Sequence, residues 1–378
     1  MNLRIMFVFI SLCAFGSLGA QSLKEKLDQA LEMLPHPHSV SDFSSLPHLS
    51  SQNQDSTLIC WSFATSSFLE SEMKRLGKEP IRLSVMFPVY HGMIEKAKRY
   101  IRTKGASHFG PGDLFTGVLD IVREYGAVPA EVYEGIKTGK TIYNHQALYA
   151  ALEALMQNEK EKNTWNEPKI LAQVTNLLNK HLKAPPKKFL LKGKEYTPLT
   201  FLASVVNLPL DDYLQITSFT SAPFNQFTTL RVPDNWKQQS NYFNVPLDVF
   251  YRSLKEAVAG GYSVAIDMDN SESSYRLTKE YAFIPPFEVP DSMITQAERE
   301  KEFQSGATTD DHLMHILGCK NFSGEDWFLV KDSWRTAWEG PARGYFFFHE
   351  SYIRLKVLAF LVHRNGIPMI TSLFPAKS

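Results

Sequence analysis

The apolar positions of this chain recur with the 3.6-residue period of an α-helix in several separate stretches. One of the clearest begins at Cys60 and stops before Gly77, a residue type that commonly ends helices. Its apolar side chains near one face are Trp61, Ala64, Phe68 and Leu76. The same spacing predicts further helices over 22–34, 115–125, 146–158, 167–181 and 246–259.

A second pattern takes over in the last third of the chain, where short apolar or alternating stretches are separated by turn residues. Such stretches are typical of β-strands. Strands are predicted over 262–267, 312–320, 327–332, 344–348 and 357–363. We therefore expect helices in the first part of the chain and strands in the final part.

The longest apolar run lies at the N-terminus. Arg4 precedes an apolar stretch over 5–15, and small residues follow at Gly19 and Ala20. This order is typical of a secretory signal peptide over 1–20, cleaved after Ala20. A lipid anchor on Cys13 is the less favoured alternative, because the preceding residue is a large leucine. We expect a secreted or periplasmic protein.

Composition narrows the class further. The chain has 378 residues, of which 44% are hydrophobic, and its 40 Lys and Arg balance its 40 Asp and Glu. Zero net charge indicates neither a nucleic-acid partner nor a membrane partner for the mature form. Beyond the signal, the cysteines are Cys60 and Cys319. So few cysteines in an exported chain exclude a disulfide scaffold and favour a thiol with a chemical use.

The candidate chemistry centres on Cys60. A helix N-terminus places positive dipole at the sulfur and favours the thiolate. Gln54 lies six residues upstream, and its side-chain amide and the Cys60 backbone N–H can supply two donors to an oxyanion. His312 and Asp332 follow far downstream. Cys, His and Asp are the parts of a thiol nucleophile, its base and an orienting group.

These residues lie in motifs that resemble those of papain-like (C1) cysteine peptidases, in particular the bleomycin hydrolase and aminopeptidase C branch and its secreted bacterial relatives. The motifs are Asn53-Gln54, Cys60-Trp61-Ser62-Phe63-Ala64, Leu83-Ser84, Asp311-His312-Leu313-Met314 and Asp332-Ser333-Trp334. They occur in the family's order. The resemblance covers residues 46–135 and 246–364.

The resemblance implies an α+β, two-lobed fold. Residues 46–135 would form the helical lobe with the nucleophile, and residues 246–364 a β-barrel-like lobe with His312 and Asp332. Residues 136–245 would be a large, mainly helical insertion near the cleft rim. Residues 21–45 then form an N-terminal arm and residues 365–378 a C-terminal tail.

The resemblance also implies peptide or protein substrates, cleaved through a thioester on Cys60, with no cofactor and no metal. Trp334 would shield the contact between His312 and the orienting residue. Gly110 and Gly112 would hold the substrate backbone, although an ordinary turn explains them as well.

Cleavage is expected to be aminopeptidase-like, because in that branch a C-terminal arm lies in the cleft and blocks one side. Residues 364–378 are predicted to act in this way. Two alternatives stay open, in which the insertion blocks the cleft or nothing does and the enzyme is an endopeptidase.

Four positions depart from the family pattern. Leu58 and Arg335 replace glycines, Val85 replaces a glutamate, and Asp332 replaces an asparagine. They motivate an alternative hypothesis, a weak or inactive homologue that binds peptides or a protein partner. A third hypothesis is an acyltransferase or amidase built on a similar cleft. The sequence leaves the oligomeric state and the side-chain preference undetermined.

Overall fold

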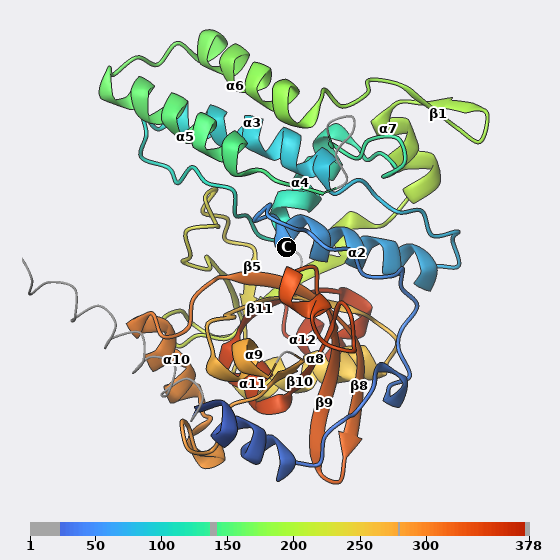
Figure 1. The fold of residues 1–378 in the computed structure, drawn as a ribbon, viewed down its shortest axis with the longest axis vertical. Helices are drawn as coiled ribbons and strands as arrows, with labels where there is room; N and C mark the ends of the chain where they lie inside the picture. The colour runs from blue at the N-terminus through green and yellow to red at the C-terminus, as the bar shows by residue number, and fades with distance from the viewer. Residues whose placement is uncertain (1–22, 137–141, 279, 375–378) are drawn as a thin grey trace, which may run out of the picture.

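The computed structural model describes residues 23–136, 142–278 and 280–374. The predicted signal peptide over 1–20 lies outside these residues. Figure 1 shows a helical part above a strand-rich part, joined where α2 meets β8. The helices of the upper part are α2 (Cys60–Arg75), α3 (Met86–Arg102), α4 (Phe115–Tyr125), α5 (Gln146–Glu161) and α6 (Glu167–Leu182).

Helix α2 is buried along most of its length, because α3 and α4 cover it on one side and the sheet covers it on the other. The predicted helix that starts at Cys60 is confirmed, as is α4 over its predicted range. Helix α3 was not predicted. It carries Pro88 within its first turn, where proline is tolerated, and an apolar face that packs on α4 and α6.

The strands form one open nine-stranded sheet, in the order β4-β5-β3-β11-β6-β8-β9-β10-β7. They are β3 (Tyr213–Thr217), β4 (Gln226–Thr228), β5 (Tyr242–Asn244), β6 (Val264–Met268), β7 (Tyr281–Ala282), β8 (His312–Phe322), β9 (Glu325–Lys331), β10 (Tyr345–His349) and β11 (Val357–His363). The five predicted strands are confirmed as β6, β8, β9, β10 and β11. Most neighbours are antiparallel, and β3/β5 and β10/β7 are parallel.

The two faces of the sheet are covered by different helices. One face carries α2, and the other packs on α8 (Leu247–Ala259) and α11 (Glu350–Lys356), with α12 (Pro368–Thr371) packed against α8. Strand β8 shows the alternation: Leu313 belongs to the core beside α2, whereas Met314 and Ile316 belong to the core beside α8. The start of β8 therefore lies beside the first turn of α2. Two further helices of this part are α9 (Ser273–Leu277) and α10 (Gln296–Ser305).

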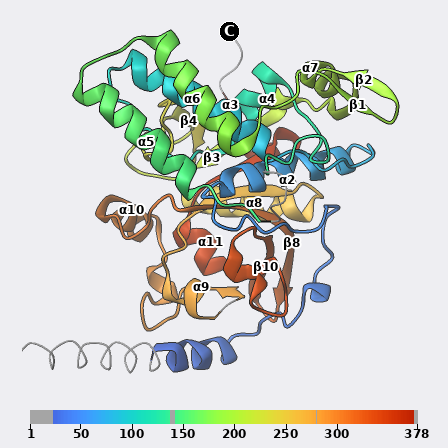
Figure 2. The same cartoon turned by 45° about the horizontal axis from the view of Figure 1, so that its top comes forward.

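The segment over 136–245 combines the predicted helices with strands that were not predicted. Helices α5 and α6 form an outer layer over α3, as Figure 2 shows. The segment continues with a hairpin of β1 (Phe189–Leu191) and β2 (Lys194–Tyr196) and the short α7 (Pro198–Phe201). Strands β3, β4 and β5 then join the main sheet, where β3 pairs with β11. These three short strands are specified by partners distant in the sequence, so their own residues give little local signal.

The N-terminal arm is ordered on the strand-rich part. Residues 23–32 form a helix whose Leu27 and Leu31 pack in a small core with Phe347. Trp327 Nε1 also donates a hydrogen bond to the Pro35 carbonyl at 2.9 Å. The arm is thus anchored on β9 and β10.

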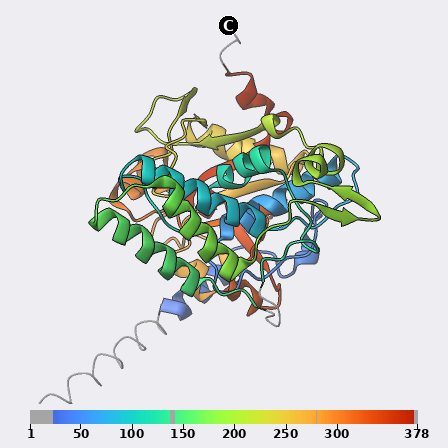
Figure 3. The same cartoon turned by 90° about the horizontal axis from the view of Figure 1, so that it is seen from above.

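The described part of the C-terminal tail does not enter a cleft beside Cys60, contrary to the prediction. Ile367 and Ile370 are buried against α8, and the Phe374 ring lies 4.6 Å from that of Phe243. These contacts lie on the face of the sheet opposite α2, and Figure 3 shows α12 on the side away from α5 and α6. Burial of three apolar side chains explains this position. Residues 375–378 lie outside the described part.

None of the helices in the described part of the chain is long and apolar enough to cross a bilayer. The two described cysteines, Cys60 and Cys319, both carry free thiols. Burial raises the pKa of Cys319 to about 12, so that thiol stays protonated at neutral pH.

Candidate active site

Cys60 is the first residue of α2. The preceding residue, Ile59, gives the helix no side-chain cap, so the first backbone N–H groups, including that of Cys60, are not capped by a side chain. The Leu313 N–H at the start of β8 points at Cys60 Sγ from 3.5 Å. The sulfur therefore lies at the junction of α2 and β8.

His312 and Asp332 meet at this junction. His312 Nε2 lies 2.7 Å from Asp332 Oδ1, and both side chains are almost completely buried. Burial acts to lower the pKa of His312, but the interactions with Asp332 and Cys60 outweigh it and raise that pKa to about 10. The Asp332 contact occupies Nε2, which leaves Nδ1 to exchange a proton with the thiol.

Asp332 is held by two further donors. The Trp334 N–H donates to Oδ1 at 2.9 Å, and the Tyr275 hydroxyl donates to Oδ2 at 3.0 Å. The Trp334 ring lies edge-on to the His312 ring, with centroids 6.0 Å apart. Tyr275 belongs to this hydrogen-bonded group but was not predicted from the sequence, because it lies on α9 with no motif around it.

Gln54 also lies at the junction, and the nitrogen of its side-chain amide makes no hydrogen bond. Its Oε1 accepts a hydrogen bond from Ser333 Oγ at 2.8 Å, and its backbone N–H donates to the Ser333 carbonyl at 2.8 Å. The side chain is completely buried, and its Nε2 has no hydrogen-bond partner. A buried amide with an unused donor is costly unless a ligand uses it. This is the arrangement expected of an oxyanion donor.

The loop with Gly110 and Gly112 is fixed beside the nucleophile. Trp61 Nε1 donates to the Pro111 carbonyl at 3.0 Å, which ties the loop to the first turn of α2. The buried Lys96 ammonium donates to the Gly110 carbonyl at 3.1 Å and also to the Gly112 carbonyl. Both carbonyls are therefore already paired with Lys96, and only other atoms of this loop remain for a substrate.

Three departures from the family pattern lie in different surroundings. Leu58 has a φ of 54° and is 52% exposed, although it lies two residues before the nucleophile. That left-handed conformation favours glycine and costs a leucine about 1 kcal/mol or more. Val85 is buried, and its carbonyl accepts from Ser62 Oγ at 2.6 Å. Arg335 is exposed. Leu58 is thus the departure that faces solvent beside Cys60.

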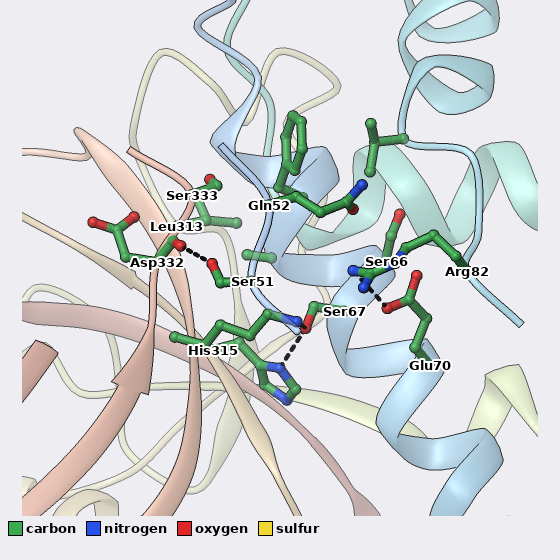
Figure 4. A pocket seen from close by; sticks show the side chains of 14 residues that line it. Ser51, Gln52, Ser66, Ser67, Glu70, Arg82, Leu313, His315, Asp332 and Ser333 are labelled. Atoms are coloured by element: carbon green, nitrogen blue, oxygen red, sulfur yellow. Dashed lines mark hydrogen bonds and ion pairs between the residues drawn. The ribbon is translucent and has the colours of Figure 1, made fainter. Parts of the chain in front are cut away.

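A polar pocket lies behind the junction, between α2 and β8–β9 (Figure 4). His315 Nδ1 lies 2.9 Å from Ser67 Oγ, and Lys331 Nζ donates to the same oxygen at 2.8 Å. Burial lowers the pKa of Lys331 to about 8. His315 thus points toward α2 while His312 points toward Asp332, so the two histidines do not form a metal pair.

Among the described residues, one group has the spacing of metal ligands. It consists of Glu325, His349 and Glu350, whose ligand atoms lie within 4.8 Å of one another. Glu325 is the first residue of β9, and Asp332 follows the last, so the group lies at the far end of that strand.

Comparisons with known proteins agree with this geometry. Aminopeptidase G of Lactobacillus delbrueckii subsp. lactis is 24% identical over 368 residues, which cover 85% of this chain and 82% of that protein. The crystal structure of PepW from Lactobacillus rhamnosis HN001 has a TM-score of 0.68 at 17% identity, covering 99% of this chain and 95% of that one. The model of the Peptidase C1-like family matches residues 109–372, which include His312 and Asp332. The chain therefore belongs to the Peptidase C1-like family and has the fold of papain-like peptidases.

Proposed function

We propose that this chain is a cysteine peptidase that hydrolyses peptide bonds through a thioester on Cys60. His312 acts as the acid and base, and Asp332 orients it. One observation carries the proposal. The buried His312 ring is held by Asp332, with Nε2 2.7 Å from Oδ1, and the backbone N–H of the following residue, Leu313, contacts Cys60 Sγ at 3.5 Å. The free Nε2 of Gln54 at the same junction supports it.

The charges favour attack by a thiolate. A His312 pKa of about 10 keeps the imidazole protonated at neutral pH, next to the sulfur. The thiolate attacks the peptide carbonyl carbon, a C–S bond forms, and the carbonyl electrons move to oxygen. Gln54 Nε2 and the Cys60 N–H donate to that oxyanion. As the C–N bond breaks, His312 gives its proton to the leaving amine.

Hydrolysis of the thioester restores the starting state. His312, now neutral, takes a proton from a water molecule, whose oxygen attacks the thioester carbonyl. The C–S bond breaks, and the sulfur leaves as a thiolate beside the imidazolium. A free carboxylic acid is released. Asp332 keeps Nε2 protonated through the whole cycle, so that Nδ1 carries each proton transfer.

We further propose that the enzyme acts as an aminopeptidase. The support is its similarity, over most of both chains, to a protein named Aminopeptidase G. As far as Phe374, the C-terminal tail packs in the core beside α8 and does not block the cleft. Aminopeptidase specificity therefore requires another element to close one end of the cleft.

The test is to incubate the purified mature chain with a peptide library and to identify the products by mass spectrometry. We expect single residues to be released from free N-termini and Cys60→Ala to release none. Internal cleavage would refute the aminopeptidase specificity. Turnover that persists in Cys60→Ala would refute the thiol mechanism. Binding of peptides without any cleavage would support the inactive homologue that Leu58 suggests.

We also propose that the chain is exported and loses residues 1–20. The support is the charge and apolar pattern of that segment. N-terminal sequencing of the protein from the culture medium and the cell envelope tests this proposal. We expect the mature chain to begin at Gln21, and an intact Met1 in the cytoplasmic fraction alone would refute export.

A further inference from the structure

A large cavity lies between the end of α3 and the loop that joins β4 to β5, and the mechanism above does not use it. Its volume of about 780 Å³ falls within the range of about 300–1,000 Å³ that is typical of ligand-binding pockets. One wall comes from α3 and the segment that follows it, and this wall carries Arg99. The other wall comes from the β4–β5 loop and carries Arg231. We call this space the arginine cavity.

The two arginines of the cavity have no acidic partner. No described carboxylate forms an ion pair with Arg99 or Arg231, and none of the described residues that line the cavity is acidic. Arg99 Nε is buried without a hydrogen-bond partner, and so is Ser107 Oγ on the same wall. Buried donors without acceptors are costly. The cavity therefore has the charge and the unused donors that an anionic ligand requires.

The acidic residue of the β4–β5 loop does not fill this role. The carboxylate of Asp234 lies against Gly112, where an added Cβ would be 2.0 Å from Asp234 Oδ2. Gly112 belongs to the segment 109–112, which we call the glycine loop. Burial raises the pKa of Asp234, and neither arginine is among the charged groups that also act on that pKa. Asp234 thus faces the glycine loop and leaves the arginine cavity without an anion.

Both walls of the cavity are held in place by hydrogen bonds. In the β4–β5 loop, Trp236 Nε1 donates to Asp113 Oδ2 at 2.8 Å. In the opposite wall, Thr103 Oγ1 donates to the Arg99 carbonyl at 2.9 Å and accepts from the Ser107 N–H at 3.0 Å. A site that is already formed loses little conformational freedom when a ligand binds.

The cavity adjoins the glycine loop and, through it, the nucleophile. The His108 side chain lines the cavity and lies against Gly110, where an added Cβ would be 2.7 Å from His108 Nε2. Trp61 Nε1 donates to the Pro111 carbonyl of the same loop at 3.0 Å, so the loop lies at the first turn of α2. A peptide that is bound at Cys60 and extends along the glycine loop therefore brings a more distant side chain to the cavity.

We propose that the arginine cavity binds an acidic side chain of the substrate peptide. This inference rests on the proposed peptidase function and names its substrate class. The planar guanidinium group of arginine binds a carboxylate through two parallel hydrogen bonds. The buried Leu230 and Trp236 side chains in the same cavity offer apolar contacts to the methylene groups of a glutamate. A glutamine has nearly the same shape without the charge, and a lysine is repelled by Arg99 and Arg231.

Binding to the Cys60→Ala chain tests the site without relying on turnover. The probes are six-residue alanine peptides with a single glutamate at each position in turn, and the same peptides with glutamine in its place. We expect the glutamate peptide to bind roughly 10- to 100-fold more tightly at one position, as for a hydrogen-bonded charge. Fluorescence anisotropy of labelled peptides measures this difference.

Three substitutions in the Cys60→Ala chain assign the difference to the cavity. Arg99→Gln and Arg231→Gln should each remove most of it. Arg231 is exposed, so its substitution tests the site even if Arg99→Gln disturbs the packing of the partly buried Arg99. Arg252→Gln is the matched control, because it removes the same charge from an exposed side chain of α8, and it should retain the difference.

Turnover separates this inference from the proposed function. In the active chain, kcat/KM should favour the selected glutamate peptide over its glutamine counterpart by roughly 10- to 100-fold. Equal binding at every position, or a difference that survives both Arg99→Gln and Arg231→Gln, would overturn the acidic site even if the peptides are cleaved. Selective binding without any cleavage would support the site and refute the peptidase. Inorganic phosphate that binds only when both arginines are present, with equal binding of the two peptide series, would overturn the inference in favour of a site for a free anion.

Discussion

Replacing Asp332 with Asn tests the charge state on which the mechanism depends. The carboxylate accepts hydrogen bonds from His312 Nε2 at 2.7 Å, Trp334 N–H at 2.9 Å and Tyr275 Oη at 3.0 Å. An asparagine keeps the shape and can still accept from His312 through its Oδ1, but it removes the negative charge. We therefore expect the His312 imidazole to keep its position and to lose its proton at a lower pH.

The size of the effect follows from the charges. Two unit charges about 4 Å apart interact by about 4 kcal/mol at an effective dielectric constant of about 20, and about 1.4 kcal/mol corresponds to one pH unit. The pKa of His312 is about 10 in the native chain. Asp332→Asn should thus bring the alkaline limb of the pH–rate profile down by roughly two to three pH units.

The assay is the pH dependence of kcat/KM for a peptide that the chain cleaves, measured with and without the substitution. Tyr275→Phe is the matched control, because it removes one neutral donor to Asp332 and keeps the carboxylate. It should move the alkaline limb by less than about one pH unit. An alkaline limb that does not move in Asp332→Asn would refute the pairing of His312 with Asp332.

The same pairing predicts a stability that depends on pH. The pKa of His312 is raised in the folded chain, from an unfolded value of about 6.5 to about 10. Its contribution to the free energy of unfolding is therefore fully present below about pH 6.5 and is lost as the pH rises through about 10. The difference in the free energy of unfolding between the native chain and Asp332→Asn should therefore be larger at pH 6 than at pH 10.5. Denaturant unfolding at the two pH values measures this difference, and an equal difference at both would contradict it.

Two further substitutions and one deletion give separate checks. Gln54→Ala should lower kcat by about 10²–10³, and a loss below about threefold would show that Gln54 Nε2 is not an oxyanion donor. Leu58→Gly allows the φ of 54° without strain and removes an exposed side chain beside Cys60. It should raise the melting temperature slightly and broaden the range of substrate side chains that are cleaved. An unchanged cleavage profile with the peptide library would show that Leu58 does not restrict the substrate. Deleting 367–378 removes the buried Ile367 and Ile370, each worth about 1.5–3 kcal/mol. It should lower the melting temperature without creating internal cleavage, which the appearance of endopeptidase activity would contradict.

Much of the reacting centre could be predicted from the sequence because its residues lie in local patterns. Cys60 starts an amphipathic helix, Gln54 precedes it by a short loop, and His312 starts a strand. Each of these features depends on neighbours within a few positions, and the structure brings all of them to one junction. Asp332 follows the same logic, because it comes directly after a predicted strand.

The residues around this centre could not be predicted, because long-range pairing places them. Tyr275 reaches Asp332 from a helix of only five residues, and no spacing connects the two. Strands β3 to β5 are short, and their partners lie elsewhere in the chain. The C-terminal tail shows the opposite failure. The family resemblance implied an arm in the cleft, but Ile367 and Ile370 are buried in the core beside α8.

The position of the C-terminal tail decides which elements can lie beside the glycine loop. A terminal arm can restrict a cleft only if the chain end reaches the cleft, and here the described tail lies on the other face of the sheet. A loop fixed through Trp236 and Asp113 reaches the glycine loop instead and brings the carboxylate of Asp234 onto Gly112. The same loop precedes β5 and is therefore tied to the main sheet at its end. The position of this carboxylate beside the glycine loop is therefore set by strand pairing and by the Trp236–Asp113 hydrogen bond, and not by the C-terminal tail as far as Phe374.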